Sequence, residues 1–199
     1  MDEGYIKFKA QWTRSQPLAQ DLLQDIIHWR DLLYQKKLIG VYDNGIGYGN
    51  ISQRWNGTDQ FIISGSATGY LQLLTNQNFT LIEKVNIDQN TVWCKGPIIA
   101  SSETMSHAVI YQACPEVNGV MHVHHIELWK KLLHQVPTTI SSATYGSPEM
   151  AYAIIELLQT SNVRQTKLFV MEGHPEGIFT FGGSLAEAGE ILIQHFDYL

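Results

Sequence analysis

Strand-like and helix-like segments alternate along this chain, and their order is the feature that most constrains its fold. Runs with β character are separated by stretches in which hydrophobic residues recur at three- and four-residue steps, the spacing of one helix face. Turn sequences such as Asn56-Gly57 divide neighbouring β-like runs. Helices that stand before, between and after several strands pack naturally as a two-layer or three-layer α/β sandwich.

The periodicity predicts the following elements. We expect β-strands at residues 49–55, 60–64, 79–87, 91–94, 118–124, 138–142, 167–172 and 177–181. We expect helices at residues 17–38, 103–114, 125–134, 147–160 and 184–195. The first helix has a regular apolar face, made of Leu18, Leu22, Ile26, Trp29 and Leu33.

Capping residues mark where several of these helices begin. We expect Ser15 to cap the first helix, with Pro17 in its first turn and Gly40 after its end. Ser101 or Ser102 is the expected cap of the second helix. Two later starts carry typical signals, which are Ser147-Pro148-Glu149 and the capping box Ser184-Leu185-Ala186-Glu187.

The composition indicates one acidic, soluble domain over residues 1–199, with residues 1–16 as an N-terminal extension. Thirteen Lys and Arg against nineteen Asp and Glu give a net charge of -6, and the scattered basic residues argue against a nucleic-acid partner. The sequence contains no apolar run long enough to span a membrane and no signal peptide, so we expect no membrane partner. Two cysteines, Cys94 and Cys114, make no disulfide scaffold and favour the cytoplasm.

Two histidines in one β-like run give the first chemical signal. His122 and His124 are two residues apart, so on a strand both imidazoles point to the same face. That arrangement suits two ligands of one tetrahedral zinc ion. The alternative is a pair of buried histidines that bond to the backbone. His125 points to the opposite face and is left out of the ligand set.

A catalytic zinc needs a third protein ligand and an open position. The best third candidate is His174, which follows a predicted strand in the Gly-flanked turn Glu172-Gly173-His174-Pro175-Glu176-Gly177. The alternative is a turn histidine without a role. His107 is expected to be structural. No role is expected for the histidines on helical surfaces, namely His28, His134 and His195.

Ser101-Ser102-Glu103 stands directly before a predicted helix. Hydroxyls and unbonded N–H groups at a helix start can bind an anion. Beside a metal, Glu103 could be a ligand or the general base. On composition alone, plain capping of the helix is the favoured interpretation.

Two short segments are rich in glycine and hydroxyl side chains, and each adjoins a predicted strand. They are Gly49-Asn50-Ile51-Ser52 and Ser64-Gly65-Ser66-Ala67-Thr68-Gly69. Backbone N–H groups in such segments can bind phosphate or another anion. The spacing of the nearby glycines does not match a dinucleotide-binding fingerprint, and no G-x-S-x-G hydrolase motif occurs.

In order along the chain, these motifs resemble the class II aldolase/adducin head-domain family. The matching segments are Gly49-Asn50-x-Ser52, Thr68-Gly69, Ser101-Ser102-Glu103, His122-Val123-His124, Tyr145-Gly146-Ser147-Pro148-Glu149 and His174. The resemblance extends from about residue 18 to the C-terminus. It implies a three-layer α/β/α sandwich with a central, largely antiparallel sheet, assembled as a homotetramer with zinc or another divalent metal at a subunit interface.

The resemblance also implies roles for individual residues. His122, His124 and His174 would bind the metal, and Glu103 would be the catalytic acid/base. The substrate phosphate would be held by Gly49, Asn50, Thr68, Gly69, Ser101 and Ser102. The expected function is a metal-dependent, aldolase-like lyase that acts on a small hydroxy-ketone or sugar phosphate through a zinc-stabilised enediolate.

Three other functions remain open on the same fold. The same enediolate would serve a dehydratase of the methylthioribulose-phosphate type or a pentulose-phosphate epimerase. A non-catalytic, adducin-like interaction domain is the third alternative, and it would have no need of metal ligands.

The sequence departs from the family pattern in three places. Pro175 and Glu176 separate His174 from Gly177, where the family has histidine followed by glycine. The family's catalytic tyrosine has no evident counterpart, and Tyr145 and Tyr152 are the candidates for that role. The cations near the proposed site in sequence are few, namely Arg54, Lys84 and Lys95.

Overall fold

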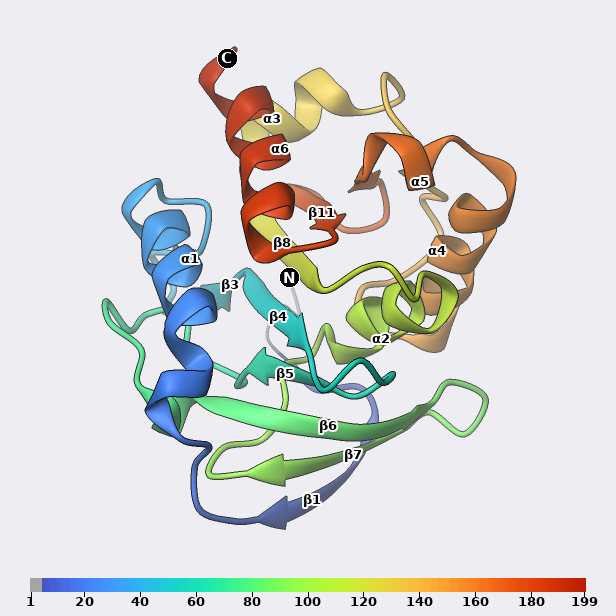
Figure 1. The fold of residues 1–199 in the computed structure, drawn as a ribbon. Helices are drawn as coiled ribbons and strands as arrows, with labels where there is room; N and C mark the ends of the chain where they lie inside the picture. Colours follow the sequence, from blue (N-terminus) through green and yellow to red (C-terminus); the bar gives the residue numbers. More distant parts are fainter. Residues whose placement is uncertain (1–4) are drawn as a thin grey trace.

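A nine-stranded sheet runs through the protein (Figure 1) in a computed structural model that describes residues 5–199. Its strand order is β1-β7-β6-β5-β4-β8-β11-β10-β9. All neighbouring pairs are antiparallel except β1/β7 and β10/β9, which are parallel. The strands are β1 Lys9–Arg14, β4 Asn50–Arg54, β5 Phe61–Ser64, β6 Phe79–Asn86, β7 Thr91–Gly96, β8 Gly119–His124, β9 Thr138–Thr139, β10 Leu168–Met171 and β11 Gly177–Gly182.

The remaining elements are a small hairpin and the helices. Strands β2 (Gly40–Val41) and β3 (Gly47–Tyr48) pair outside the main sheet. The helices are η1 Gln20–Leu23, α1 Gln24–Gln35, η2 Asn76–Asn78, α2 Thr104–Ala113, α3 Ile126–Leu132, α4 Pro148–Thr160, α5 Val163–Thr166 and α6 Leu185–Asp197. None of the helices in residues 5–199 is long and apolar enough to cross a membrane.

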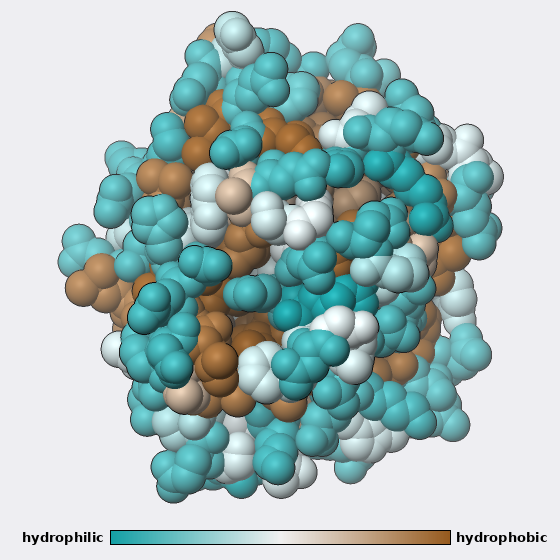
Figure 2. Space-filling model, in the orientation of Figure 1, coloured by the Kyte–Doolittle hydropathy of each residue, from teal (hydrophilic) through white to brown (hydrophobic). Residues whose placement is uncertain are grey.

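Two apolar clusters, one on each face of the sheet, show that the fold has three layers. Helices α2 and α4 pack on one face through side chains such as Met105 and Ile154. Helices α1, α3 and α6 cover the other face through side chains such as Ile26 and Leu192. On the face of the molecule seen in Figure 2, hydrophilic residues predominate and hydrophobic ones show chiefly in the gaps between them. The predicted α/β/α sandwich with a largely antiparallel sheet is confirmed.

Strand β8 shows how the two-residue period of the sequence sorts side chains between the layers. Val120 packs in the cluster under α2 and α4, whereas Met121 and Val123 pack in the cluster under α1 and α6. His122 and His124 therefore share the face of Val120. Since β8 lies between β4 and β11 in the middle of the sheet, both histidines are held on a rigid element.

The first helix differs from the prediction at its start. Residues 17–19 are not helical, Gln20–Leu23 form a 3-10 turn, and the α-helix begins at Gln24. Ser15 does not cap it, because the Ser15 hydroxyl donates to the carbonyl of Gln16 instead. The turn directs Leu22 toward solvent, so this predicted core residue is exposed.

Two other boundaries also differ. The predicted strand at residues 138–142 is reduced to Thr138–Thr139, and Ile140 is exposed. Helix α2 begins at Thr104 with Glu103 at the N-cap position, so capping by Ser101 or Ser102 is wrong. The two later caps are confirmed, because Ser147 and Ser184 accept hydrogen bonds from the third residue that follows each of them.

The N-terminal segment adds a strand that the sequence analysis did not predict. Within the predicted extension 1–16, residues Lys9–Arg14 form β1, which pairs in parallel with β7 at the edge of the sheet. The segment just before β1 contributes Phe8 to the apolar cluster under α2 and α4. Residues 1–4 of the extension lie outside the described part of the chain.

Candidate metal centre and its pocket

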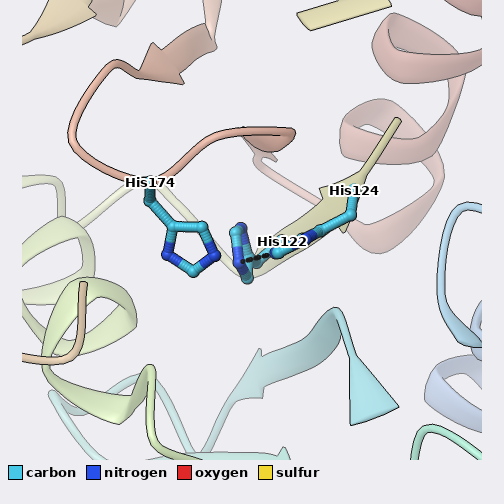
Figure 3. A group of neighbouring side chains, drawn as sticks. All are labelled: His122, His124 and His174. Carbon is cyan, nitrogen blue, oxygen red and sulfur yellow. Dashed lines mark hydrogen bonds between the residues drawn. The ribbon is translucent and has the colours of Figure 1, made fainter. Parts of the chain in front are cut away.

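Three histidines, two from one strand and one from a loop, meet at one point (Figure 3). His122 and His124 come from β8, and His174 comes from the loop between β10 and β11. Each ring offers one ligand nitrogen, and these three nitrogens all lie within 4.8 Å of one another. The three side chains are 1%, 3% and 4% exposed, so their rings are removed from bulk water.

Hydrogen bonds fix which nitrogens face the centre. Nδ1 of His122 lies 3.3 Å from the carbonyl oxygen of Ile178, and Nδ1 of His124 lies 2.9 Å from the hydroxyl of Tyr42. The Nε2 atoms of the two histidines therefore point at each other, 3.0 Å apart. Two nitrogen ligands on a tetrahedral zinc, with Zn–N bonds of about 2.0–2.1 Å, stand about 3.3 Å apart, so the spacing fits one shared ion.

Burial keeps all three imidazoles neutral. Desolvation lowers the pKa of His122 and His124 well below the usual value, and the neighbouring histidines lower it further. The pKa of His174 falls to about 3, mainly through desolvation and secondarily through the charge of Lys7. Neutral imidazole is the form that binds a metal ion. The donor set, the burial and the protonation state therefore all fit a divalent metal.

Glu103 lies beside the histidines, at the start of α2. Its carboxylate is 2% exposed, and its Oε2 accepts a hydrogen bond of 2.9 Å from the hydroxyl of Ser106. Its Oε1 lies 3.9 Å from Nδ1 of His174. The contact with Ser106, one helical turn further on, fixes the rotamer and aims the other oxygen at the histidine cluster.

All ten residues singled out in the sequence line one pocket. It is bounded by His122, His124, His174, Glu103, Gly49, Asn50, Thr68, Gly69, Ser101 and Ser102. Two glycines allow the loops to approach this closely. Gly49 has φ +76°, which glycine adopts without strain, and a Cβ on Gly69 would collide with the carbonyl oxygen of Gly40.

Asn50 is oriented by a buried chain of hydrogen bonds. Nε2 of His107 lies 2.6 Å from Oδ1 of Asn50, and Nδ1 of His107 lies 2.6 Å from Oγ of Ser52, which in turn contacts the hydroxyl of Tyr111. With the Asn50 oxygen bonded to His107, its NH₂ group is the part left to face the pocket. His107 is thus buried, as expected for a structural histidine, and it sets the polarity of one pocket wall.

The cations suggested by the sequence lie elsewhere. The guanidinium of Arg54 is buried against the carbonyl groups of Val117, Tyr111 and Cys114. Lys84 packs over the ring of Trp93, and Lys95 is an exposed residue of β7. None of the three lines the pocket.

Two other cations approach the pocket, and no sequence pattern marks them. Arg30 of α1 is fully buried and donates to the carbonyl oxygens of Thr68 and Gly69 at 3.0 and 3.4 Å. It places positive charge behind the loop that carries both residues. Lys7 donates to the carbonyl of Tyr145 at 3.2 Å, with its Nζ 3.5 Å from the centroid of that ring.

The structure separates the two tyrosine candidates. Tyr145 lines the pocket, with its ring centroid 4.6 Å from that of His174. Tyr152 is exposed and bonds to Asp88, so it does not line the pocket. Two tyrosines that the sequence analysis missed, Tyr42 and Tyr48, contact His124. Both lie in the glycine-rich segment just before Asn50, where the motifs include glycines and Asn50 but no tyrosine.

The remaining histidines lie away from the pocket lining. His125 caps α3 by accepting from the backbone N–H of Leu128. His28 and His134 are exposed, and His134 pairs with Glu172. His195 lies in the last turn of α6.

Comparisons with known proteins agree with this fold. The sequence model of the Class II Aldolase and Adducin N-terminal domain matches residues 25–195. Comparison with curated protein sequences gives no match.

Three solved structures illustrate the likeness of the fold. An L-fuculose 1-phosphate aldolase is 18% identical with a TM-score of 0.68, over 92% of this chain and 85% of that one. A sugar-phosphate aldolase from Thermotoga maritima is 16% identical with a TM-score of 0.64, over 88% and 91% of the two chains. An aldolase II superfamily protein from Pseudomonas syringae is 16% identical with a TM-score of 0.61, over 92% and 75%.

Proposed function

Because the chain belongs to the class II aldolase and adducin N-terminal domain family, we propose that it is a metal-dependent lyase of aldolase type. Its substrate would be a small hydroxy-ketone or sugar phosphate. The observation that carries the proposal is the cluster of three buried, neutral histidines with a buried carboxylate beside it. Histidine nitrogens and an adjacent proton carrier are the parts that such a reaction needs.

His122, His124 and His174 would hold the ion, which we propose is zinc. When bound, a divalent ion supplies Lewis-acid stabilisation of negative charge on carbonyl and hydroxyl oxygens, a contribution of several kcal/mol. The protein's part is to keep the three nitrogens converged and the rings neutral. Burial of all three side chains supports both requirements.

Glu103 would carry the proton. Ser106 holds one carboxylate oxygen at 2.9 Å, which leaves the other directed at the histidine cluster and toward the pocket. A carboxylate fixed beside the reacting carbon can remove a proton or return one, typically for a rate factor of about 10² to 10⁴. Tyr145 is our candidate for a second proton donor, since it lines the same pocket.

Gly49, Asn50, Thr68, Gly69, Ser101 and Ser102 would bind the anionic end of the substrate. Backbone N–H groups of the glycine-rich loops and the NH₂ of Asn50 are the donors. Arg30 supports this role from behind the loop, because its guanidinium donates to the carbonyl oxygens of Thr68 and Gly69.

Two related reactions and one non-enzymatic role are the alternatives. A dehydratase of methylthioribulose-phosphate type and a pentulose-phosphate epimerase would use the same metal and carboxylate. An adducin-like interaction domain would need neither. The convergence of three buried imidazoles and a buried carboxylate on one pocket favours an enzyme over a purely structural domain.

We further propose a single domain over residues 1–199 that assembles as a homotetramer. The family resemblance supports this assembly, because it implies a metal site at a subunit interface, where a second copy of the chain would border the pocket. The two free cysteines agree with a reducing cytoplasm as the location.

A panel of substrates tests the proposal. Zinc-loaded protein is incubated with hydroxy-ketones and their phosphates, and aldehyde release, water loss and epimer formation are followed separately. We expect aldehyde release from at least one phosphorylated hydroxy-ketone and loss of all turnover after chelation. Water loss or epimerisation without aldehyde would replace the aldolase with the matching alternative. A protein that binds no divalent metal and turns over nothing would be the interaction domain.

A further inference from the structure

His122 and His124 differ in what holds the nitrogen that faces away from the centre. His122 has a backbone carbonyl at 3.3 Å from its Nδ1. His124 has a side-chain partner instead, because its Nδ1 lies 2.9 Å from the hydroxyl of Tyr42. That hydroxyl in turn donates to Oε2 of Glu176 at 2.8 Å. A carboxylate, a phenol and an imidazole thus form a continuous hydrogen-bonded line.

We propose that Tyr42 and Glu176 are positioning residues that orient His124 and strengthen metal binding at the three-histidine centre. This inference rests on the proposed function, since it presumes that the centre binds a metal. It goes further by assigning a role to two residues that the family motifs described above do not include. Both residues act through His124, and neither lines the pocket.

The direction of the hydrogen bonds fixes the tautomer of His124. The Tyr42 hydroxyl has one hydrogen, which goes to the Glu176 carboxylate, so the phenol oxygen is an acceptor toward His124. Nδ1 of His124 must then carry the proton, and the lone pair lies on Nε2, the atom that faces His122. Outer partners of this kind fix the ring and raise the basicity of the ligand nitrogen.

The backbone at Glu176 supports a role for its side chain. Glu176 has φ +73°, a left-handed conformation that glycine adopts readily and that is unfavourable for a glutamate. The same conformation directs its carbonyl oxygen to the N–H of His125, 3.1 Å away. A glycine would adopt this conformation without strain. The presence of a glutamate here, despite the unfavourable backbone, therefore supports a role for its side chain.

A second contact keeps the ring of His124 in place. Tyr48 stacks on it, with 5.5 Å between centroids and 26° between planes, and Tyr42 packs against Tyr48 at 4.5 Å. Tyr42 follows β2 and Tyr48 belongs to β3, so the small hairpin supplies both aromatic rings. Glu176 reaches the same point from the β10–β11 loop, which also carries His174.

Zinc affinity of the metal-free, full-length protein tests the proposal by competition with a chromogenic chelator. Tyr42→Phe removes only the hydroxyl and Glu176→Gly removes the carboxylate, and for each we expect affinity to fall by about 10- to 100-fold. The melting temperature of the metal-free protein should not fall in Glu176→Gly, because glycine relieves the strained backbone. A loss of affinity without a loss of stability separates positioning from general damage to the fold.

The double variant and a control complete the design. If the two residues act as one unit, Tyr42→Phe combined with Glu176→Gly should lose little more affinity than either alone. Glu172→Gln changes a carboxylate in the same loop that pairs with the exposed His134, and it should bind zinc within about twofold of the wild type.

The zinc affinities of the wild type and the variants distinguish a failure of this inference from a failure of the proposed function. Wild-type protein that binds zinc, together with Tyr42→Phe and Glu176→Gly that bind it equally well, would overturn the inference and leave the metal centre intact. Wild-type protein that binds neither zinc nor another divalent metal would overturn the proposed function, and this inference with it.

Discussion

Oε1 of Glu103 and Nδ1 of His174 lie 3.9 Å apart, although Glu103 is the N-cap residue of α2 and His174 lies in the β10–β11 loop. Both side chains are buried, and the pKa of His174 is lowered to about 3. The imidazole is therefore neutral near pH 7, and the contact is not an ion pair. A carboxylate that is close to the ligand cluster but not neutralised by it can serve as a proton carrier.

Removing a ligand should abolish both the metal and the activity. In His122→Ala or His174→Ala, two nitrogens remain, too few to hold a catalytic zinc ion firmly. We expect zinc content near zero after dialysis and no measurable turnover, checked by atomic absorption and by the aldehyde assay. His134→Ala, which changes an exposed histidine, should keep both. Full activity in either variant would show that the histidine replaced in it is not a metal ligand.

Glu103→Gln should separate metal binding from catalysis. The amide keeps the size of the carboxylate and can still accept from Ser106, but it cannot exchange a proton. We expect normal zinc content and a kcat about 10² to 10⁴ lower. A variant with undiminished kcat would contradict the role given to Glu103.

The stability of the metal-free protein should fall as the pH falls below about 6.5, the value for an unfolded histidine. Burial lowers the pKa of His107, His122, His124 and His174 in the folded state, so between their folded values and 6.5 the unfolded chain binds more protons. Each such histidine contributes a slope of up to about 1.4 kcal/mol per pH unit. Urea unfolding at pH 8, 6 and 5 measures this, and an unchanged midpoint between pH 7 and 5 would contradict it.

His107→Phe should weaken both the fold and the anion site. Phenylalanine fills most of the volume but leaves Oδ1 of Asn50 and Oγ of Ser52 without the histidine. A buried polar group that loses its partner costs about 1–3 kcal/mol. We expect a lower free energy of unfolding in urea and a raised KM. Unchanged values of both would show that His107 does not orient Asn50.

The sheet and most helices could be predicted because their signals are local. Period-two alternation in residues 118–124 sorts Met121 from His122, and the resulting strand places the histidines on one face. Serine followed by proline marks the start of α4, and the structure agrees. The first helix shows the limit of periodicity, because Leu22 continues the apolar spacing but lies in a 3-10 turn that exposes it.

The outer parts of the site could not be predicted, because they depend on contacts between residues far apart in the sequence. Arg30, Lys7 and Tyr42 belong to no motif, and only the arrangement of the layers brings them into contact with residues that line the pocket. Glu176 departs visibly from the family pattern in the sequence, but its contact with Tyr42 depends on the position of the small hairpin. Motifs identify residues that would contact a ligand, whereas the residues that orient them are brought into place by packing between distant parts of the chain.

X-ray absorption at the zinc edge, on protein loaded with zinc and then dialysed, tests the central claim most directly. We predict one zinc ion per chain with three imidazole nitrogens at about 2.0–2.1 Å, reduced to two or lost in His174→Ala. A wild-type protein that retains no zinc, or whose zinc has no imidazole ligands, would contradict a metal centre at these three histidines.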